Sequence, residues 1–339
     1  MPLTAFTDKL RDGGNLSAVE AEAAFGAIFT GGVADEALCA FLAALHNKGE
    51  TAEEILGAVR SMRAKAVTIS APAGAIDIVG TGGDGRGTLN ISTATAFVVA
   101  ACGVPVAKHG NRAATSKSGS SDVLAALGVN LDAPFPVLEE CLAEIGLCFL
   151  FAPRHHPAMR HVVAARKAVG TRTIFNLLGP LTNPANVKRH LIGVYEAAWL
   201  RPMAGTLSAL GSEAAWVAHG QDGTDEISIS TASDIVALKN GGIEAFSIAP
   251  AEAGLALSPA EAIKGGEAAA NAEALRAVLA GAKNAYCDAV IFNAAAALVM
   301  AGKASSLRGG AAMATQAIDN GAAQDILDRL VHMTNKVPA

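Results

Sequence analysis

The stretch from Ile76 to Arg112 constrains the fold most, because it places polar segments directly after two short apolar runs. The run Ile76–Val79 leads into glycines at positions 80, 82, 83, 85 and 87, ahead of a helix-like segment at 93–102. The run Val104–Ala107 leads into a predicted turn, Lys108-His-Gly-Asn-Arg112. Backbone N–H groups of glycine-rich loops at helix N-termini bind anions. The stretch therefore predicts a substrate with more than one phosphate.

Strand-like and helix-like segments alternate over most of the chain after residue 75. Further strands are expected at Leu147–Phe151, Leu191–Tyr195, Ala215–His219 and Glu226–Ser230, with a hairpin at Ile235–Ile248. Helices are expected between them and at about 267–281, 288–302 and 322–332. Strands separated by helix-length segments predict parallel crossovers and a mainly parallel central sheet. The fold class expected for this part is α/β.

The first 70 residues are typical of helices only. Ser17 with Glu20, and Thr51 with Glu54, form capping-box patterns ahead of apolar segments. We expect a small all-helical domain at 1–72, joined by a helical insertion from about 157–188. The large α/β domain would comprise 73–156 and 189–339, with the active site in the cleft between the two.

Composition excludes several classes of protein. No apolar run is long enough to span a bilayer, and charged residues near the start argue against a secretory signal. Five widely spaced cysteines favour a reducing compartment and show no metal-ligand spacing. A net charge of −5 argues against a nucleic-acid binder, which needs a basic face. We expect a soluble cytoplasmic protein that binds neither membranes nor nucleic acid.

The glycine loop fits neither of two common nucleotide-binding motifs. Gly80-x-Gly82-x-x-Gly85 matches the dinucleotide fingerprint, which also needs an acidic residue about 20 positions further on. The next acidic residue after Asp84 is Asp122, so a Rossmann cofactor site is not expected. A Walker A loop is excluded because no Gly-Lys-Ser/Thr follows the glycines. A third turn, rich in hydroxyl side chains, precedes Asp122. It adds another helix N-terminus suited to binding an anion at the same edge of the predicted sheet.

Taken together, the motifs resemble the anthranilate phosphoribosyltransferase family, which joins phosphoribosyl diphosphate (PRPP) to anthranilate in tryptophan biosynthesis. The matching motifs are Gly80-Thr-Gly-Gly-Asp84, Asn90-Ile-Ser-Thr93, Lys108-His-Gly-Asn-Arg112, Ser118-Gly-Ser-Ser-Asp122, Arg172-Thr-Ile-Phe-Asn-Leu-Leu-Gly-Pro-Leu181 and Asp225-Glu226. They span most of the chain in the family's order. The resemblance implies the same two-part fold and a homodimer formed through the helical domain.

The resemblance also implies the site residues. PRPP would be bound by Gly80, Gly83, Asp84, Thr88, Asn90, Ile91, Ser92, Thr93, Lys108, His109, Gly110, Asn111, Arg112, Ser116 and Ser120. Anthranilate would be bound by Gly80, Asn111 and Arg166, and Mg²⁺, as two ions, by Ser92, Asp225 and Glu226. Hard oxygen ligands suit Mg²⁺, and the arginine fork suits a carboxylate. No residue is expected to act as a general base, since the amine of anthranilate is already neutral near pH 7.

Several residues have plainer interpretations. An Asp-Glu pair such as Asp225-Glu226 is usually a solvated turn, and Arg166 taken alone is a surface arginine. His155 and His156 are interpreted as pocket wall or helix start, and His109 lies between the two substrate positions. The chain departs from the family pattern where Thr115 replaces a more usual serine and where Gly223-Thr224 precedes the Asp-Glu pair.

Two alternatives remain open from the sequence. A pyrimidine nucleoside phosphorylase has the same two-part fold, but its glycine loop resembles Lys-His-Ser-Thr-Gly-Gly, whereas here Asp77-Ile-Val precedes Gly80. A non-catalytic relative that binds nucleic acid would have a basic surface and eroded phosphate and metal motifs. Neither feature is found in this chain.

Overall fold

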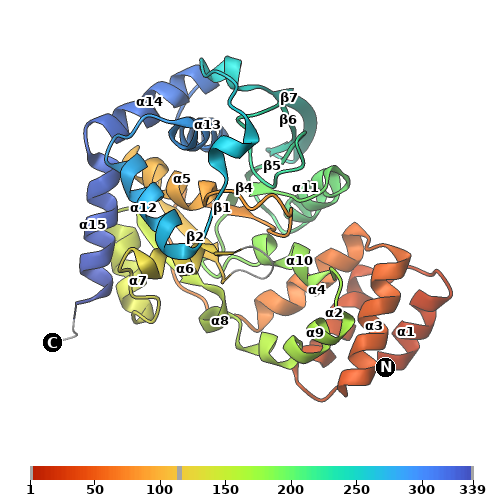
Figure 1. Ribbon diagram of the computed structural model, residues 1–339. Helices are drawn as coiled ribbons and strands as arrows, with labels where there is room; N and C mark the ends of the chain where they lie inside the picture. Colours follow the sequence, from red (N-terminus) through yellow and green to blue (C-terminus); the bar gives the residue numbers. More distant parts are fainter. Residues whose placement is uncertain (1–2, 113–116, 337–339) are drawn as a thin grey trace.

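The structure, a computed structural model, describes residues 3–112 and 117–336. Its N-terminal part is helical: α1 (Leu3–Arg11), α2 (Ala18–Phe29), α3 (Asp35–Lys48) and α4 (Ala52–Ala64) lie together at one end of the molecule (Figure 1). Both predicted capping boxes are confirmed. The Ser17 side chain accepts from the Glu20 N–H and the Thr51 side chain from the Glu54 N–H, and each glutamate reaches back to its cap.

A seven-stranded sheet forms the centre of the remaining chain, in the order β3-β2-β1-β4-β5-β6-β7. The strands are β1 (Ile76–Gly80), β2 (Val106–Gly110), β3 (Leu147–Phe151), β4 (Arg189–Gly193), β5 (Ala214–Gly220), β6 (Ser233–Lys239) and β7 (Gly242–Ile248). Pairing is parallel from β3 to β5 and antiparallel for β5-β6-β7. The expected α/β class with a mainly parallel sheet is confirmed, and so is the hairpin.

The strand order reverses between β1 and β4. From β1 the chain moves outward through β2 and β3, and it then returns to β4 on the other side of β1. Parallel sheets bind ligands at such a switch point, beyond the carboxyl ends of the strands. The glycine loop leaves β1 at this place, so the sheet topology alone predicts that the loop binds a ligand.

Helices cover both faces of the sheet (Figure 1). They are α5 (Ile91–Ala101), α6 (Ser120–Ala126), α7 (Phe135–Glu144), α11 (Leu200–Ala209), α12 (Ala268–Leu279), α13 (Ala285–Met300), α14 (Leu307–Asp319) and α15 (Ala322–Thr334). Short 3₁₀ segments are η3 (Ala197–Trp199), η4 (Pro250–Ala253) and η5 (Ala260–Ile263). The helix over 307–319 was not predicted from the sequence.

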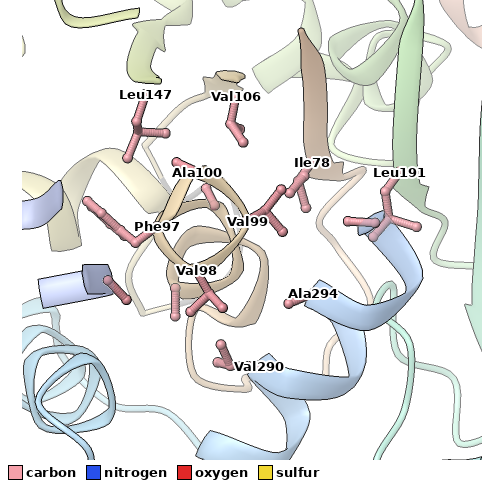
Figure 2. Packing of buried hydrophobic residues seen from close by; sticks show 14 of the residues in the cluster. Ile78, Phe97, Val98, Val99, Ala100, Val106, Leu147, Leu191, Val290 and Ala294 are labelled. Carbon is pink, nitrogen blue, oxygen red and sulfur yellow. The ribbon is translucent and has the colours of Figure 1, made fainter. Parts of the chain in front are cut away.

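Helix α5 is buried on all sides, which explains its almost entirely apolar sequence. Figure 2 shows Val99 beside Ile78 of β1, while Val98 faces Val290 of α13. The helix that carries the expected phosphate-binding N-terminus is therefore enclosed between the sheet and α13. This packing fixes its first turn relative to the end of β1.

Residues 152–181, here called the crossing segment, run from the sheet back to the N-terminal helices. The segment contains α8 (Ala152–His155), η1 (Pro157–His161), α9 (Val163–Val169), α10 (Phe175–Leu178) and η2 (Gly179–Leu181). The Phe175 ring lies 5.8 Å from the Phe25 ring and 6.2 Å from the Phe29 ring, measured between centroids. Edge-to-face aromatic packing thus attaches this segment to α2.

The strands divide their side chains between two apolar cores, as period-two alternation requires. On β4, Leu191 belongs to the core around α5, and Ile192 belongs to a second core that includes the N-terminal helices. On β6, Ile235 and Val236 divide in the same way. The second core therefore continues from the helical part, through α11, onto one face of the sheet.

Two local predictions were wrong. Residues 226–230 form no strand, although Glu-Ile-Ser-Ile-Ser alternates like one. The Ser228 and Ser230 hydroxyls both donate to Asp222 and close the segment into a compact loop. Lys108 and Gly110, expected in a turn, are the last part of β2. Among the described residues, no helix has the length and apolar character needed to cross a bilayer.

Candidate active site

The loop that carries Asp225 closes over the ends of β1 and β4. Gly80 and Gly193, the paired last residues of these strands, lie directly beneath it. A Cβ on Gly80 would lie 2.3 Å from Asp225 Oδ2, and one on Gly193 would lie 1.6 Å from the Asp225 carbonyl oxygen. The Gly82 N–H donates to Asp225 Oδ2 at 2.6 Å. Only glycine permits this approach, which brings the carboxylate to the switch point.

Two acidic side chains and the start of α5 meet at the same place. The Ser92 N–H, in the first turn of α5, donates to Glu226 Oε1 at 3.1 Å. Asp84 Oδ2 lies 3.4 Å from both the Asp225 N–H nitrogen and Thr224 Oγ1. The proposed metal residues Ser92, Asp225 and Glu226 are thus brought together, and Asp84 of the glycine loop joins them.

Lys108 supplies the positive charge of this cluster from the end of β2. Its ammonium donates to the Ile78 carbonyl oxygen at 2.5 Å and to Ser92 Oγ at 3.3 Å. The side chain is almost fully buried, and this burial lowers its pKa, while Asp77, Glu226 and Asp225 act in the opposite sense. Lys108 thus places a buried point charge, of the kind that binds phosphate, beside the acidic side chains.

The two carboxyl groups of the loop resist ionisation. Burial raises the pKa of Asp225 well above its usual value, and the charges of Asp84 and Glu226 raise it further. Burial likewise raises the pKa of Glu226 from 4.5 to about 7, although Lys108 and the Ser92 N–H oppose the shift. Acidic groups held together in this way are stabilised by a bound cation.

The residues present fit a magnesium ion that keeps part of its water shell. Among the described residues, no group of three or more histidine, cysteine, aspartate or glutamate side chains is arranged to hold a metal alone. Mg²⁺ is commonly bound by one or two carboxylates together with water and substrate phosphates. Asp225 and Glu226 provide that number of carboxylates.

The outer part of the glycine loop is tied to the C-terminal region. Thr88 forms an isolated bridge with Lys264. The Asn90 side chain is not bonded to its own helix; its Oδ1 accepts from Asn271 at 3.0 Å, and its carbonyl accepts from the Tyr286 hydroxyl. Asn90 therefore precedes α5 without capping it, and its side chain makes a tertiary bond instead. The side chains of Ile91 and Thr93, two other proposed PRPP residues, are buried.

The second predicted phosphate segment lies next to the start of α6. A Cβ on Gly110 would lie 2.3 Å from Ser120 Oγ, and that hydroxyl donates to the Asn111 carbonyl at 3.3 Å. The side chains of Asn111 and Arg112 are exposed, and Arg112 Nη1 lies 3.5 Å from Asp122 Oδ1. The proposed residue Ser116 lies outside the described residues.

Three histidines pack between the two parts of the molecule as neutral rings. The His109 and His156 rings lie 5.1 Å apart, and Nδ1 of His109 lies 3.0 Å from the Gly179 carbonyl oxygen. Burial lowers the pKa of His109 to about 3 and that of His156 to about 4. His155 Nδ1 bonds the Val67 carbonyl at 2.7 Å. All three are packing groups rather than proton carriers at neutral pH.

Arg166, the proposed anthranilate residue, lies on α9 in the crossing segment. Its guanidinium carbon is 5.4 Å from the centre of the Phe175 ring. Partial burial lowers its pKa, but an arginine remains charged at neutral pH. Among the described residues, no hydrogen bond or ion pair links this side chain to Lys108, Asp225 or Glu226.

Sequence reasoning missed a buried polar link behind the site. Asn183 donates to Asp77 Oδ2 at 2.8 Å and to the Ala107 carbonyl at 2.7 Å. The other Asp77 oxygen accepts the His109 N–H at 3.1 Å. Burial raises the pKa of Asp77 to about 6, with the charge of Lys108 opposing the shift. The link aligns β1 with β2, and no local sequence pattern connects Asn183 with Asp77.

Comparison with known proteins places this geometry in a family. The model of the glycosyl transferase family a/b domain matches residues 73–324, and that of its helical bundle domain matches residues 4–66. An anthranilate phosphoribosyltransferase from Rhodospirillum rubrum is 57% identical over 93% of this chain and 91% of its own length. The chain belongs to the anthranilate phosphoribosyltransferase family. The resemblance inferred from the motifs is therefore confirmed.

Other members agree over the full length. The family member from Methylocella silvestris is 54% identical over 97% of this chain and 94% of its own. The crystal structure of the Thermus thermophilus enzyme, 42% identical, has a TM-score of 0.92 and covers 98% of this chain and 99% of that one. The Saccharomyces cerevisiae enzyme in complex with PRPP and Mg, 27% identical, has a TM-score of 0.90 and covers 99% and 98%.

Proposed function

We propose that this chain transfers the phosphoribosyl group of PRPP to the amine of anthranilate, in tryptophan biosynthesis, and releases diphosphate. The observation that carries the proposal is the meeting of Lys108, Asp225, Glu226 and the N-terminus of α5 at the switch point of the sheet. Membership of the family, at 57% identity to a relative of that name, supports the same reaction.

The donor site comprises the glycine loop, the first turn of α5 and the end of β2. In this proposal the N–H groups of the loop and of the α5 N-terminus bind phosphate oxygens, and Lys108 adds a point charge. His109, Gly110, Asn111 and Arg112 extend the site toward α6, where Ser116 and Ser120 belong to it as well. Asp84 and Thr88 complete the loop side of the same site.

Ser92, Asp225 and Glu226 would hold Mg²⁺, which we propose as two ions. A metal bound there would offset the negative charge that gathers on the leaving diphosphate. The raised pKa values of both carboxyl groups support this assignment, because a cation restores their ionised forms.

Arg166 would bind the carboxylate of anthranilate through two parallel hydrogen bonds, with Asn111 and Gly80 beside the amine. The attacking nitrogen needs no base to become nucleophilic, since an aromatic amine is neutral near pH 7. The neutral state of His109 and His156 supports a mechanism without an imidazole base. The chain would accelerate displacement at the anomeric carbon by orienting both substrates and stabilising the departing charge.

The remaining assignments are proposals of the same kind. We propose a helical domain of residues 1–72 with the insertion at about 157–188, and an α/β domain of 73–156 and 189–339, with the active site between them. A homodimer would form through the helical domain. We place the enzyme in the cytoplasm on the basis of its widely spaced free cysteines.

One assay separates this proposal from its alternatives. Loss of anthranilate fluorescence should require both PRPP and Mg²⁺, and removal of the metal by a chelator should stop it. Phosphorolysis of thymidine is the control for the nucleoside phosphorylase alternative, and retention on an RNA or DNA column is the control for a nucleic-acid-binding relative. Turnover of thymidine without turnover of anthranilate would refute the proposed reaction.

A further inference from the structure

Arg172 is the first residue of the Arg172–Leu181 motif and has no role in the proposed active site. It follows α9, which ends at Gly170 in a left-handed conformation with φ of 69°. Its neighbours Thr173 and Phe175 are buried against the helical part, whereas the Arg172 side chain points outward and is 42% exposed. The residue thus extends from the crossing segment, beyond the core that anchors this segment.

Three contacts hold the Arg172 side chain, and all three are with the sheet part of the molecule. Nη2 donates to the Gly83 carbonyl oxygen at 2.5 Å. Nη1 donates to Glu196 Oε1 at 3.0 Å, and the guanidinium carbon lies 4.2 Å from the centre of the Tyr195 ring. Tyr195 is the second residue after β4, so a ring anchored at the end of the sheet limits where the Arg172 guanidinium can point.

The contact with Gly83 sets the direction of a peptide group in the glycine loop. The Gly83 carbonyl and the Asp84 N–H belong to one planar trans peptide and point in opposite directions. With the carbonyl bonded to Arg172, the Asp84 N–H is turned away from the crossing segment. The Asp84 side chain is held separately, because its Oδ2 lies 3.4 Å from the Asp225 nitrogen. Arg172 and the Asp225 loop therefore hold two neighbouring groups, the Gly83 carbonyl and the Asp84 carboxylate.

Both ends of the glycine loop are bonded to other parts of the chain. The Thr81 N–H donates to the Gly193 carbonyl at 2.9 Å, and Thr81 Oγ1 accepts the Tyr195 N–H at 3.1 Å. At the far end, the Gly265 N–H donates to the Gly87 carbonyl at 2.8 Å. The bond from Arg172 to Gly83 is thus placed between these two bonded ends of the loop.

We propose that Arg172 is a positioning residue: it holds the glycine loop in the conformation that binds PRPP before the donor arrives. The proposal rests on the donor site proposed above. Because Arg166 and Arg172 lie on the same segment, the element that carries the acceptor cation also shapes the donor loop.

Hydrogen exchange of the substrate-free enzyme tests the positioning role without turnover. The amides of Thr81 and Gly82 are hydrogen-bonded in this structure, so they report loop order. Arg172→Gln should speed exchange of the peptide covering 81–87 by about tenfold, the value of one charged hydrogen bond. Glu196→Gln is the matched control, because it removes only an exposed ion pair and should leave exchange within about twofold of wild type. Unchanged exchange in Arg172→Gln would overturn the proposal.

Kinetics distinguish positioning from direct binding of a phosphate. Arg172→Gln should raise the KM for PRPP about tenfold and leave that for anthranilate within about twofold. Arg172→Lys should not restore the wild-type KM for PRPP, since an ammonium cannot stack on the Tyr195 ring and bond both Gly83 and Glu196 as the guanidinium does. Recovery in Arg172→Lys, together with normal exchange, would instead make Arg172 a phosphate ligand. If Lys108→Ala left the PRPP KM unchanged, the donor site itself would be wrongly placed, and the exchange result would still stand.

Discussion

Magnesium affinity should depend steeply on pH, because the metal and a proton compete for Glu226. Burial raises the pKa of this carboxyl to about 7, so the group passes from mostly ionised to mostly protonated between pH 8 and pH 6. The metal needs the ionised form. Affinity should therefore fall as the pH drops through 7, whereas an ordinary glutamate would stay ionised over this whole range.

The size of the effect follows from the fraction of Glu226 that is ionised. With a pKa of about 7, that fraction falls from roughly nine-tenths at pH 8 to roughly one-tenth at pH 6. The half-saturating Mg²⁺ concentration should then rise about tenfold over the two units. Asp225, whose pKa is also raised, would add to the change in the same direction.

The measurement is the Mg²⁺ dependence of anthranilate fluorescence loss at pH 6, 7 and 8, with PRPP saturating. The phosphates of PRPP also titrate near this range, so a matched variant is needed. Glu226→Gln keeps the size of the side chain and cannot ionise, and it reports the remaining contribution of PRPP and Asp225. From pH 8 to pH 6, the half-saturating Mg²⁺ concentration should rise about tenfold more in the wild-type enzyme than in the variant. Identical slopes in the two proteins would refute the competition argument.

Three substitutions test other parts of the site and its support. Arg166→Ala should raise the anthranilate KM about tenfold to a hundredfold with little change for PRPP; unchanged anthranilate kinetics would remove this residue from the acceptor site. Asn183→Ala leaves Asp77 without one of its donors and should lower the free energy of unfolding by about 2–3 kcal/mol in urea denaturation; a loss below about 0.5 kcal/mol would contradict the buried link. Gly193→Ala places a Cβ 1.6 Å from the Asp225 carbonyl and should raise the half-saturating Mg²⁺ concentration at least tenfold, or prevent folding; a folded variant with normal metal dependence would refute the close approach.

Most of the fold could be predicted from local signals in the sequence. The capping boxes at Ser17 and Thr51 use residues three positions apart, so one chain is enough to recognise them. The glycine loop marked the end of β1 correctly, whereas the end of β2 was placed three residues too early, because the strand continues from Ala107 to Gly110. In each case the deciding contacts lie within a few residues, or follow from the right-handed parallel crossover.

The errors have equally physical causes. Alternation over 226–230 was mistaken for a strand because the hydroxyls of Ser228 and Ser230 turn inward to Asp222, a partner that periodicity cannot identify. Helix α14 was missed because Gly309 and Gly310 weaken its helical pattern. A Cβ on Gly310 would lie 2.8 Å from Ala295 of α13, so the glycine is needed for close packing between distant segments.

The residues of the candidate site could be predicted only in part from the sequence. Asp225 and Glu226 were identified through the family resemblance, since an acidic pair in a loop is ordinary by itself. The bonds from Asn183 to Asp77 and from Arg172 to Gly83 join residues 106 and 89 positions apart. No spacing rule connects such residues, and their roles became visible only with the strands in register.

The second apolar core has a consequence for how the molecule loses its structure. Family models divide the chain into a helical bundle at 4–66 and an α/β part from 73, yet Ile192 and Val236 of the sheet share one core with Phe25. Cutting between the two parts would expose that sheet face to water. The boundary therefore separates two family domains that should unfold together as one cooperative unit. Heating should melt both in a single calorimetric transition, and neither fragment should be recovered as a stable protein by itself.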